Sequence, residues 1–228
     1  MHPLETMDPA EIKVVWSEQL GGPRRPIDPS RPRVGLLAIQ GDFAMHRKMV
    51  ESLGHECCEV RTLDELLKVD CLIMPGGEST TMRKILKSDV LWMSIPHFAK
   101  KHAIMGTCAG LVLLGKNIVG ARPEEDSLGL IDIDSDRNAY GSQYHSFRKS
   151  GEVVFEGPPR LMEMVFIRAP QITRVGPGVE VLGRLDQTST MVRQGNILAL
   201  TFHPELTEDA TIHQFFIEQV VMSAGSRG

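Results

Sequence analysis

Short apolar runs alternate with helix-forming stretches between residues 34 and 75, and this alternation constrains the fold more than any other feature of the sequence. A continuous apolar run covers Val34 to Ile39, as in a strand that is buried on both faces. The pattern then predicts a helix over residues 43–53, a strand over 56–60, a short helix over 63–67 and a strand over 71–75. This β-α-β-α-β order favours a doubly wound sheet.

The same kind of pattern continues along the chain. Helices are predicted from TMRKIL and over residues 90–101, followed by a short strand at AIMG, a tight turn at GTCAG and a helix from Leu111. Beyond about residue 128, short β-rich runs precede an amphipathic helix over residues 212–222. We therefore predict an α/β fold with an open, mostly parallel sheet, helices on both faces, and antiparallel β additions in the C-terminal half.

Composition narrows the classes of partner and compartment. Residues 1–32 are rich in proline and are predicted to form a flexible N-terminal extension before a domain over residues 33–228. A net charge of -4 and a pI near 6.1 offer no basic field for nucleic acid. The sequence lacks an apolar run of membrane-spanning length, and its acidic first residues do not resemble a signal peptide. The four cysteines include no CxxC pair, which argues against a disulfide framework and a structural metal site. Together these features predict a cytoplasmic protein that binds no nucleic acid, membrane or metal.

Cys108 is the candidate nucleophile. It lies in GTCAG, between a predicted strand and a predicted helix, where a sharp turn would expose the sulfur and the helix N-terminus would favour the thiolate. We expect Gly106 and Gly110 to permit this turn by tolerating unusual backbone angles and by leaving room beside the thiol. A lone cysteine is more often a packed apolar residue, which is the role we assign to Cys57, Cys58 and Cys71.

His203 and Glu205 are the candidate partners of that nucleophile. They stand in ALTFHPEL, and Pro204 is expected to keep His203 extended, so that residues 203 and 205 project to the same side. His203 would act as general base and later as general acid, while Glu205 would hold its other ring nitrogen. The other histidines lack such a pairing in the sequence, and we expect surface or packing roles for His46, His55, His97, His102, His145 and His213.

The segment PGGEST follows the third predicted strand, at the edge where open parallel sheets bind ligands. An amide of Gly76 or Gly77, together with the amide of Ala109, is the predicted oxyanion hole. The segment also suits a simple turn, a phosphate-binding loop, or a helix cap with Ser79 or Thr80 as the capping residue. The GK[ST] spacing of a P-loop is absent from it.

Taken in order, PGGEST, GTCAG and FHPEL resemble the class I glutamine amidotransferases, and more narrowly the glutaminase subunits of two-component pyridoxal 5′-phosphate synthases. The resemblance runs from about Val34 to Val221 and includes GLLAIQGDF, PGGESTTMR, VFIRAP and FHPELTED. Val112 stands where other class I members usually have glutamine, which favours the vitamin B6 branch. The resemblance implies hydrolysis of L-glutamine through Cys108, His203 and Glu205, and it implies no cofactor.

The resemblance also implies contacts with the substrate. Gly77, Glu78 and Ser79 match the glutamine-binding loop of the family, and its other glutamine-contacting positions match Arg137, Ile167 and Arg168. An arginine and a carboxylate such as Glu78 suit the two charged ends of free glutamine. Since the sequence shows no partner for Arg137, a solvated surface role for it stays open.

The family further implies a protein partner. Its members pass ammonia to a separate synthase subunit within a hetero-oligomer, and contact with that subunit completes the oxyanion hole. Residues 38–41 match the contact segment, and Gln40 is the candidate coupling residue. Ser142 and His145 replace the arginine and aspartate that are usual in the family, a departure that concerns the predicted interface and not the triad.

Two other functions are compatible with these motifs. A cysteine hydrolase of the same fold would cleave peptides or small amides without a partner, and a comparison of glutamine with peptide amides would distinguish it. A catalytically silent binding subunit would keep only the fold. Because Cys108, His203 and Glu205 are all present, a catalytically inactive subunit is disfavoured.

Overall fold

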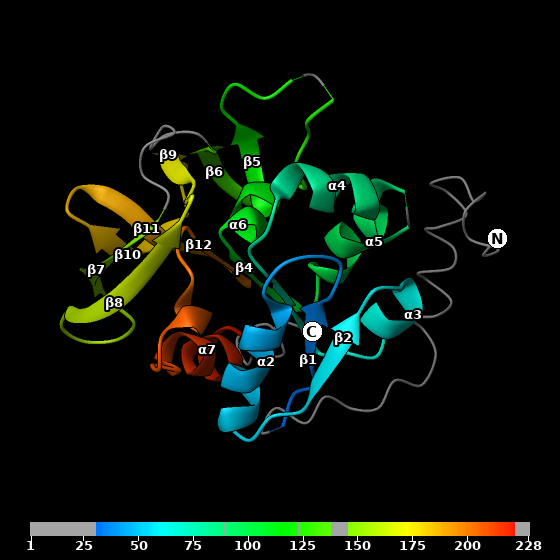
Figure 1. The fold of residues 1–228 in the computed structure, drawn as a ribbon, viewed down its shortest axis with the longest axis horizontal. Helices are drawn as coiled ribbons and strands as arrows, with labels where there is room; N and C mark the ends of the chain where they lie inside the picture. The colour runs from blue at the N-terminus through cyan, green and yellow to red at the C-terminus, as the bar shows by residue number, and fades with distance from the viewer. Residues whose placement is uncertain (1–30, 89, 123, 138–145, 222–228) are drawn as a thin grey trace.

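The computed structural model describes residues 31–88, 90–122, 124–137 and 146–221, which form an α/β fold (Figure 1). The predicted extension over residues 1–32 lies outside the described residues except at positions 31 and 32. The predicted domain boundary at residue 33 therefore stays a prediction.

A nine-stranded sheet forms the centre of the fold, and one half of it is parallel. The parallel strands are, in spatial order, β2 (Cys57–Val60), β1 (Val34–Leu37), β3 (Cys71–Met74), β4 (Ala103–Thr107) and β12 (Ile197–Leu200). Antiparallel strands continue the sheet as β11 (Thr188–Gln194), β10 (Glu180–Leu185), β7 (Ser146–Val153) and β8 (Arg160–Ile167). The predicted α/β fold, with a parallel core and antiparallel additions, is confirmed.

Strand β12 differs from the prediction in its pairing. The sequence pattern assigns all the β-rich runs after residue 128 to antiparallel additions, but β12 pairs in parallel with β4. All four residues of β12 are buried, as expected of a strand with both faces covered. Because Leu200 lies opposite Thr107, the chain that leaves β12 toward His203 lies close to the turn that holds Cys108.

A second, three-stranded sheet is not indicated by the sequence pattern. It contains β5 (Gly115–Ile118), β6 (Ile131–Asp136) and β9 (Gln171–Val175). Strand β5 begins where the predicted helix from Leu111 was to continue, because helix α6 (Ala109–Leu114) has only six residues. The middle residues of β5, Lys116 and Asn117, are exposed and polar, so this strand has no apolar run to reveal it.

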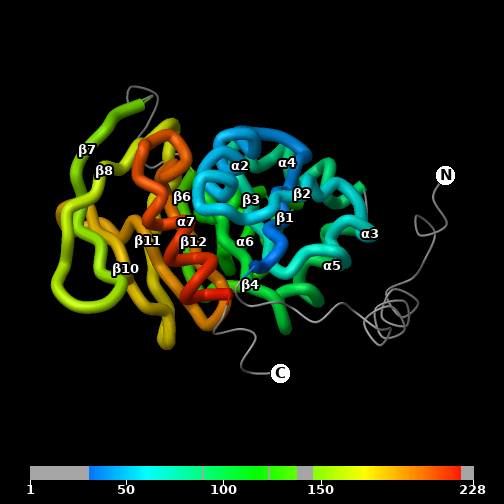
Figure 2. Tube along the Cα trace, turned by 90° about the horizontal axis from the view of Figure 1, so that it is seen from below, coloured from blue at the N-terminus to red at the C-terminus, as the bar shows by residue number. Residues whose placement is uncertain are grey.

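Helices cover both faces of the large sheet. On one face lie α2 (Phe43–Ser52) and α7 (Thr211–Phe215), which is followed by the π-helical segment η3 (Phe216–Val221); α2 and α7 lie side by side in Figures 1 and 2. The predicted helix over residues 212–222 is thus divided between two helical forms. On the other face lie α3 (Leu63–Leu66), α4 (Ser79–Lys87), α5 (Leu91–Phe98) and α6.

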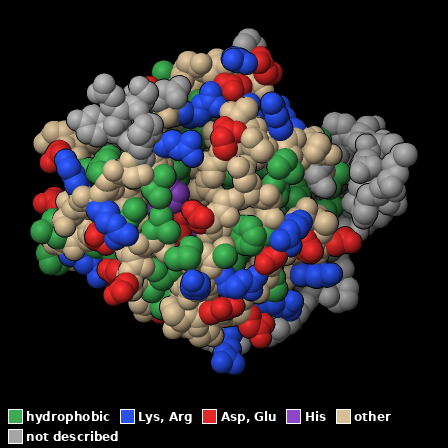
Figure 3. All heavy atoms as spheres, viewed as in Figure 1, with side chains coloured by type: hydrophobic (Ala, Val, Ile, Leu, Met, Phe, Trp, Pro, Cys, Tyr) green, Lys and Arg blue, Asp and Glu red, His purple; other side chains and the backbone are tan. Residues whose placement is uncertain are grey.

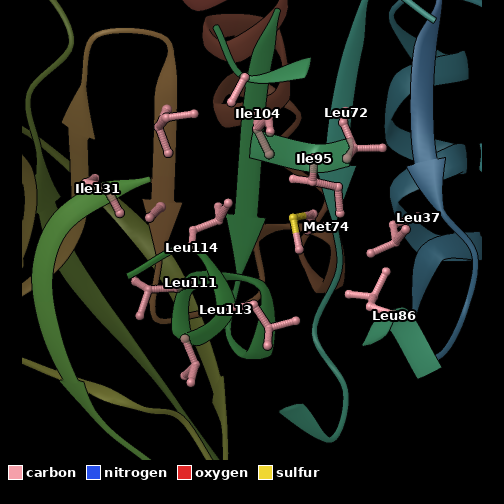
Figure 4. Close-up of a cluster of buried hydrophobic side chains, with 14 of the residues drawn as sticks. Leu37, Leu72, Met74, Leu86, Ile95, Ile104, Leu111, Leu113, Leu114 and Ile131 are labelled. Atoms are coloured by element: carbon pink, nitrogen blue, oxygen red, sulfur yellow. The ribbon is translucent and has the colours of Figure 1, made fainter. Parts of the chain in front are cut away.

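Alternate residues of the central strands supply two hydrophobic cores. On β3, Leu72 and Met74 belong to the core that includes α4, α5 and α6, part of which is shown in Figure 4. Cys71 and Ile73 belong to the core beneath α2 and α7. This alternation follows from the two-residue period of a β-strand, and it means that both cores depend on the same strands.

The surface is mixed in charge. Basic and acidic side chains are interspersed over the face shown in Figure 3. Among the described helices, none combines the length and the apolar character needed to cross a bilayer.

Candidate active site

Cys108 occupies a strained turn between β4 and α6. Its backbone has φ 49° and ψ -105°, a left-handed conformation that is uncommon for any residue with a side chain. The backbone N–H of Cys108 donates to Leu200 O at 2.8 Å, which ties the turn to the end of β12. The predicted strand-to-helix elbow at Cys108 is therefore present, and the unusual backbone angle is at the cysteine itself. The predicted exposure of the sulfur is wrong, because Cys108 is only 6% exposed and is reached through the cavity that it lines.

The neighbouring glycines serve this turn in a different way from the one predicted. Neither Gly106 nor Gly110 has a positive φ. A Cβ on Gly106 would lie 2.7 Å from the carbonyl carbon of Gly110, and a Cβ on Gly110 would overlap the carbonyl oxygen of Met74. These glycines are therefore required because backbone segments approach each other closely.

His203 and Glu205 are paired behind the cysteine. Their side chains are only 4% and 0% exposed, and His203 Nδ1 lies 2.7 Å from Glu205 Oε1. His203 is non-helical as expected, with φ -109° and ψ 89°, but the expected strand alternation to Glu205 is wrong, because Pro204–Leu206 form a 3-10 turn, η2. Pro204 at the start of this turn suits its fixed φ. The tight turn, not strand alternation, brings the carboxylate to the imidazole.

The electrostatics of His203 favour its protonated form. Burial lowers its pKa, but the interactions with Cys108 and Glu205 outweigh burial and raise the pKa to about 10. His203 Nε2 is buried and makes no hydrogen bond of normal geometry with any described residue. The ring therefore has one nitrogen bonded to a carboxylate and the other available to Cys108. The sulfur of Cys108 lies 3.9 Å from the backbone oxygen of Ile167.

A cavity of about 500 Å³ adjoins Cys108 and His203. Its wall contains all six predicted substrate-binding residues, the predicted coupling residue Gln40, and Ala109 of the predicted oxyanion hole. Four further residues of the wall were not predicted to line the site: Asp42, Thr80, Val112 and Pro170. Gly76 is not part of this wall. Instead, a Cβ on Gly76 would overlap Cε1 of His203, so this glycine makes room for the imidazole.

Glu78 has a local structural role at the edge of the cavity. It is the N-cap of α4, and its carboxylate accepts hydrogen bonds from the backbone N–H groups of Thr80 and Thr81 at 3.0 and 2.7 Å. The alternative prediction of a helix cap is thus correct in kind but wrong in residue, since neither Ser79 nor Thr80 is the cap. A contact between Glu78 and a substrate ammonium would use the remaining lone pairs of its carboxylate.

Arg137 has partners that the sequence did not reveal. Its guanidinium donates to Glu125 Oε2 at 2.6 Å and to Thr80 Oγ1 at 3.0 Å. Glu125 in turn contacts the buried Arg83, with 3.5 Å between the carboxylate and the guanidinium. The hydrogen bond from Arg137 is the main reason that the pKa of Glu125 falls to about 2. Arg137 is therefore held at the cavity wall and is not a freely solvated side chain, whereas Arg168 is exposed there with φ 43°.

Two other histidines have partners that the sequence did not reveal. His46 and His213 are completely buried and lie behind Glu205: His46 Nε2 is 3.4 Å from Glu205 Oε2, and His46 Nδ1 is 2.9 Å from His213 Nε2. His46 lies on α2, far in sequence from both Glu205 and His213, so no local pattern predicts its contacts with them. His145 and Ser142 lie outside the described residues.

One group of described residues has the composition of a metal site. Asp42, His203 and Glu205 offer ligand atoms within 4.8 Å of one another. His203 Nδ1 and Glu205 Oε1 are already joined by their own hydrogen bond, so a metal ion would have to break the pair. The arrangement fits proton transfer better than metal binding.

Comparisons with known proteins agree with this geometry. Residues 36–222 match the model of the SNO glutamine amidotransferase family. A pyridoxal 5′-phosphate synthase subunit PdxT from Fervidobacterium nodosum is 47% identical over 188 residues, covering 82% of this chain and 96% of the relative. The protein of the same name from Oenococcus oeni is 45% identical over 186 residues, covering 82% and 95%. A solved structure described as a glutamine amidotransferase has a TM-score of 0.77 and 43% identity, covering 83% of this chain and 98% of that one. The chain therefore belongs to the SNO glutamine amidotransferase family.

Proposed function

We propose that this chain is the glutaminase subunit of a pyridoxal 5′-phosphate synthase, which hydrolyses L-glutamine to L-glutamate and ammonia through Cys108, His203 and Glu205. The observation that carries the proposal is the strained Cys108 beside a buried imidazole whose Nδ1 is held by Glu205 and whose Nε2 has no hydrogen bond among the described residues. The names of the relatives support the same activity.

The chemistry proceeds in two halves. His203 takes the thiol proton, and the sulfur of Cys108 forms a bond to the amide carbon of glutamine. The tetrahedral intermediate collapses by breaking the C–N bond, and His203 returns the proton to the departing ammonia. Water then loses a proton to His203 and attacks the thioester, and the C–S bond breaks to release glutamate. Glu205 keeps the imidazole oriented and stabilises its protonated form throughout.

Substrate recognition is assigned to the cavity wall. The α-carboxylate of glutamine would pair with Arg137 or Arg168, and the α-ammonium would lie near Glu78, while Gly77, Ser79 and Ile167 shape the space around the side chain. The Glu125 carboxylate supports this role by holding Arg137 in place before substrate arrives.

The oxyanion hole is assigned to the backbone amide of Ala109 and an amide of Gly76 or Gly77. Ala109 follows the nucleophile at the first position of α6 and lines the cavity, as does Gly77, while Gly76 lies against the His203 ring. Donors aimed at the developing oxyanion are typically worth about 100-fold or more in kcat.

The ammonia is proposed to pass to a synthase subunit in a hetero-oligomer, with Gln40 as the coupling residue. Gln40 lines the cavity, and its buried Oε1 has no hydrogen-bond partner among the described residues, so a partner or substrate group could satisfy it. We further propose a cytoplasmic location without nucleic-acid or membrane partners, which agrees with the free cysteines and the net charge of -4.

The test is glutamate release from L-glutamine by the chain with and without the synthase subunit. Cys108→Ala should abolish hydrolysis in both cases and leave the fold intact, because removing one sulfur atom leaves little cavity. His203→Asn should be nearly as damaging, and Glu205→Ala milder, since Glu205 does not enter the covalent steps. Hydrolysis that survives in Cys108→Ala would show that another group is the nucleophile.

A further inference from the structure

Glu205 has a second carboxylate oxygen that the proposed mechanism does not use. The side chain is 0% exposed, and its Oε1 is bonded to His203. Its Oε2 is buried and has no hydrogen bond of normal geometry among the described residues. Burying an ionised carboxylate oxygen without a donor is unfavourable, so a donor nearby would matter for the triad.

His46 supplies a ring nitrogen at that oxygen. Its Nε2 lies 3.4 Å from Glu205 Oε2 and 3.2 Å from the hydroxyl of Thr107. Its Nδ1 lies 2.9 Å from His213 Nε2. All three neighbours of the His46 ring are completely buried, and they come from η2, β4 and α7, so the ring is fixed from three elements.

Two proton arrangements are possible in this network, and the structure favours one of them. If His46 Nε2 carries the proton, it donates to the hydroxyl oxygen of Thr107 and places a polarised N–H 3.4 Å from Glu205 Oε2, while His46 Nδ1 accepts from His213 Nε2. His213 Nδ1, which has no partner among the described residues, then carries only a lone pair. In the reverse arrangement His213 Nδ1 is a buried donor without an acceptor among the described residues, and His46 Nε2 accepts from the Thr107 hydroxyl with its lone pair close to the carboxylate. The first arrangement leaves fewer groups unsatisfied.

Burial keeps both histidines neutral at neutral pH. Burial is the main influence on His46 and lowers its pKa, against the Glu205 carboxylate and Asp42, which raise it, while His203 lowers it further. Burial also lowers the pKa of His213 to about 3. Glu205 itself faces His203 at the start of η2, His46 from α2, His213 from α7, and Asp42, the N-cap of α2. His46 therefore acts as a neutral hydrogen-bond donor, and not as a second cation.

We infer that His46 is a positioning residue of this active site: its protonated Nε2, hydrogen-bonded to Thr107, faces Glu205 Oε2 at 3.4 Å, and His213 selects the ring tautomer that makes this possible. The inference rests on the proposed glutaminase function. A carboxylate with one oxygen bonded to His203 and the other beside a buried N–H is held more firmly in its orientation, and it stays ionised at lower pH.

A matched pair of substitutions tests the role of Nε2. The amide nitrogen of glutamine reaches the position of histidine Nε2, whereas that of asparagine reaches only the position of Nδ1. Glutamate release by the complex with its synthase partner should be followed from about pH 5 to about pH 9. His46→Gln should keep kcat within about twofold of the unmodified protein. His46→Asn should lower kcat about tenfold, with KM for glutamine nearly unchanged, and should move the acid limb to higher pH, because a carboxylate that loses a donor is protonated more easily.

Two substitutions of His213 provide a second test, which can be made even if the protein does not fold with residue 46 changed. His213→Gln keeps a donor toward His46 and should retain activity, whereas His213→Leu should lower kcat several-fold and shift the acid limb in the same direction. His97→Gln, on the opposite face of the sheet, is the control and should change neither quantity. Equal losses in both variants of a pair, or an unmoved acid limb in His46→Asn, would overturn the inference.

A readout without turnover separates this inference from the proposed function. Alkylation of Cys108 by iodoacetamide, followed by mass spectrometry, should be slower at neutral pH in His46→Asn than in His46→Gln. If the unmodified complex releases no glutamate, the proposed function fails. The alkylation rates then still decide whether His46 acts on the Cys108–His203 pair, since equal rates would contradict it.

Discussion

At position 76 the lack of a side chain is required by the neighbouring imidazole. A Cβ there would overlap Cε1 of His203 and lie 3.0 Å from its Nδ1. The ring cannot retreat easily, because its Nδ1 is bonded to Glu205 and the site is buried. Gly76 therefore belongs to the machinery that places the proposed base, in addition to its predicted part in the oxyanion hole.

Gly76→Ala should lower kcat by about 100-fold, because a displacement of the base by about 1 Å has effects of this size. The free energy of unfolding should fall by only about 1–3 kcal/mol, as is usual for overpacking. The matched control is Gly115→Ala, where a Cβ would meet its nearest neighbour at 3.4 Å, an ordinary contact. Unchanged turnover in Gly76→Ala would mean that His203 does not need its observed position.

Among the secondary-structure elements, the connection between β5 and β6 has a direct link to the site through Glu125. This carboxylate joins the buried Arg83 of α4 to Arg137 at the end of β6. Its folded pKa of about 2 lies below the value of about 4.3 for an unfolded glutamate. The stabilisation it provides is therefore complete above the unfolded value and is lost as pH falls toward 2.

Glu125→Gln should reduce the free energy of unfolding at neutral pH by about 3 kcal/mol, because Arg83 is left buried without its carboxylate. The difference from the unmodified protein should narrow as pH falls below about 4.3, which urea titrations at several pH values would measure. KM for glutamine should rise more than kcat falls, since Arg137 loses its support. Glu124→Gln, at an exposed neighbour, is the control. A constant difference at every pH would contradict this account.

For the whole molecule, the two hydrophobic cores share the same strands and should unfold together. Leu72→Ala and Ile73→Ala remove fully buried side chains from opposite faces of β3, and each should cost about 3 kcal/mol. Urea denaturation followed by circular dichroism and by fluorescence should give one coincident transition with an unchanged slope in both variants. Leu161→Ala, at a side chain that is 71% exposed, should change stability by less than about 0.5 kcal/mol. Separate transitions would show that the cores are independent units.

Local pattern alone was enough to predict the α/β fold class, the elements from β1 to β4, and the turn at Cys108. Buried parallel strands appear as continuous apolar runs, and glycine-bounded turns mark their ends, so these features depend on residues that are close in sequence. The pairing of His203 with Glu205 was also predictable, because the two residues are separated only by Pro204. The sequence-based reason, alternation along an extended strand, was nevertheless wrong, since Glu205 lies in the 3-10 turn η2.

Tertiary structure decided the features that depend on distant segments. The parallel pairing of β12 with β4, the second sheet, the Arg83–Glu125–Arg137 chain and the His46–His213 contact, across 167 positions, join residues with no common local signal. A polar side chain in a sequence looks the same whether it will be solvated or buried. Only packing from several elements removes water from His46 and Glu205, and this burial turns two ordinary residues into interacting parts of one site.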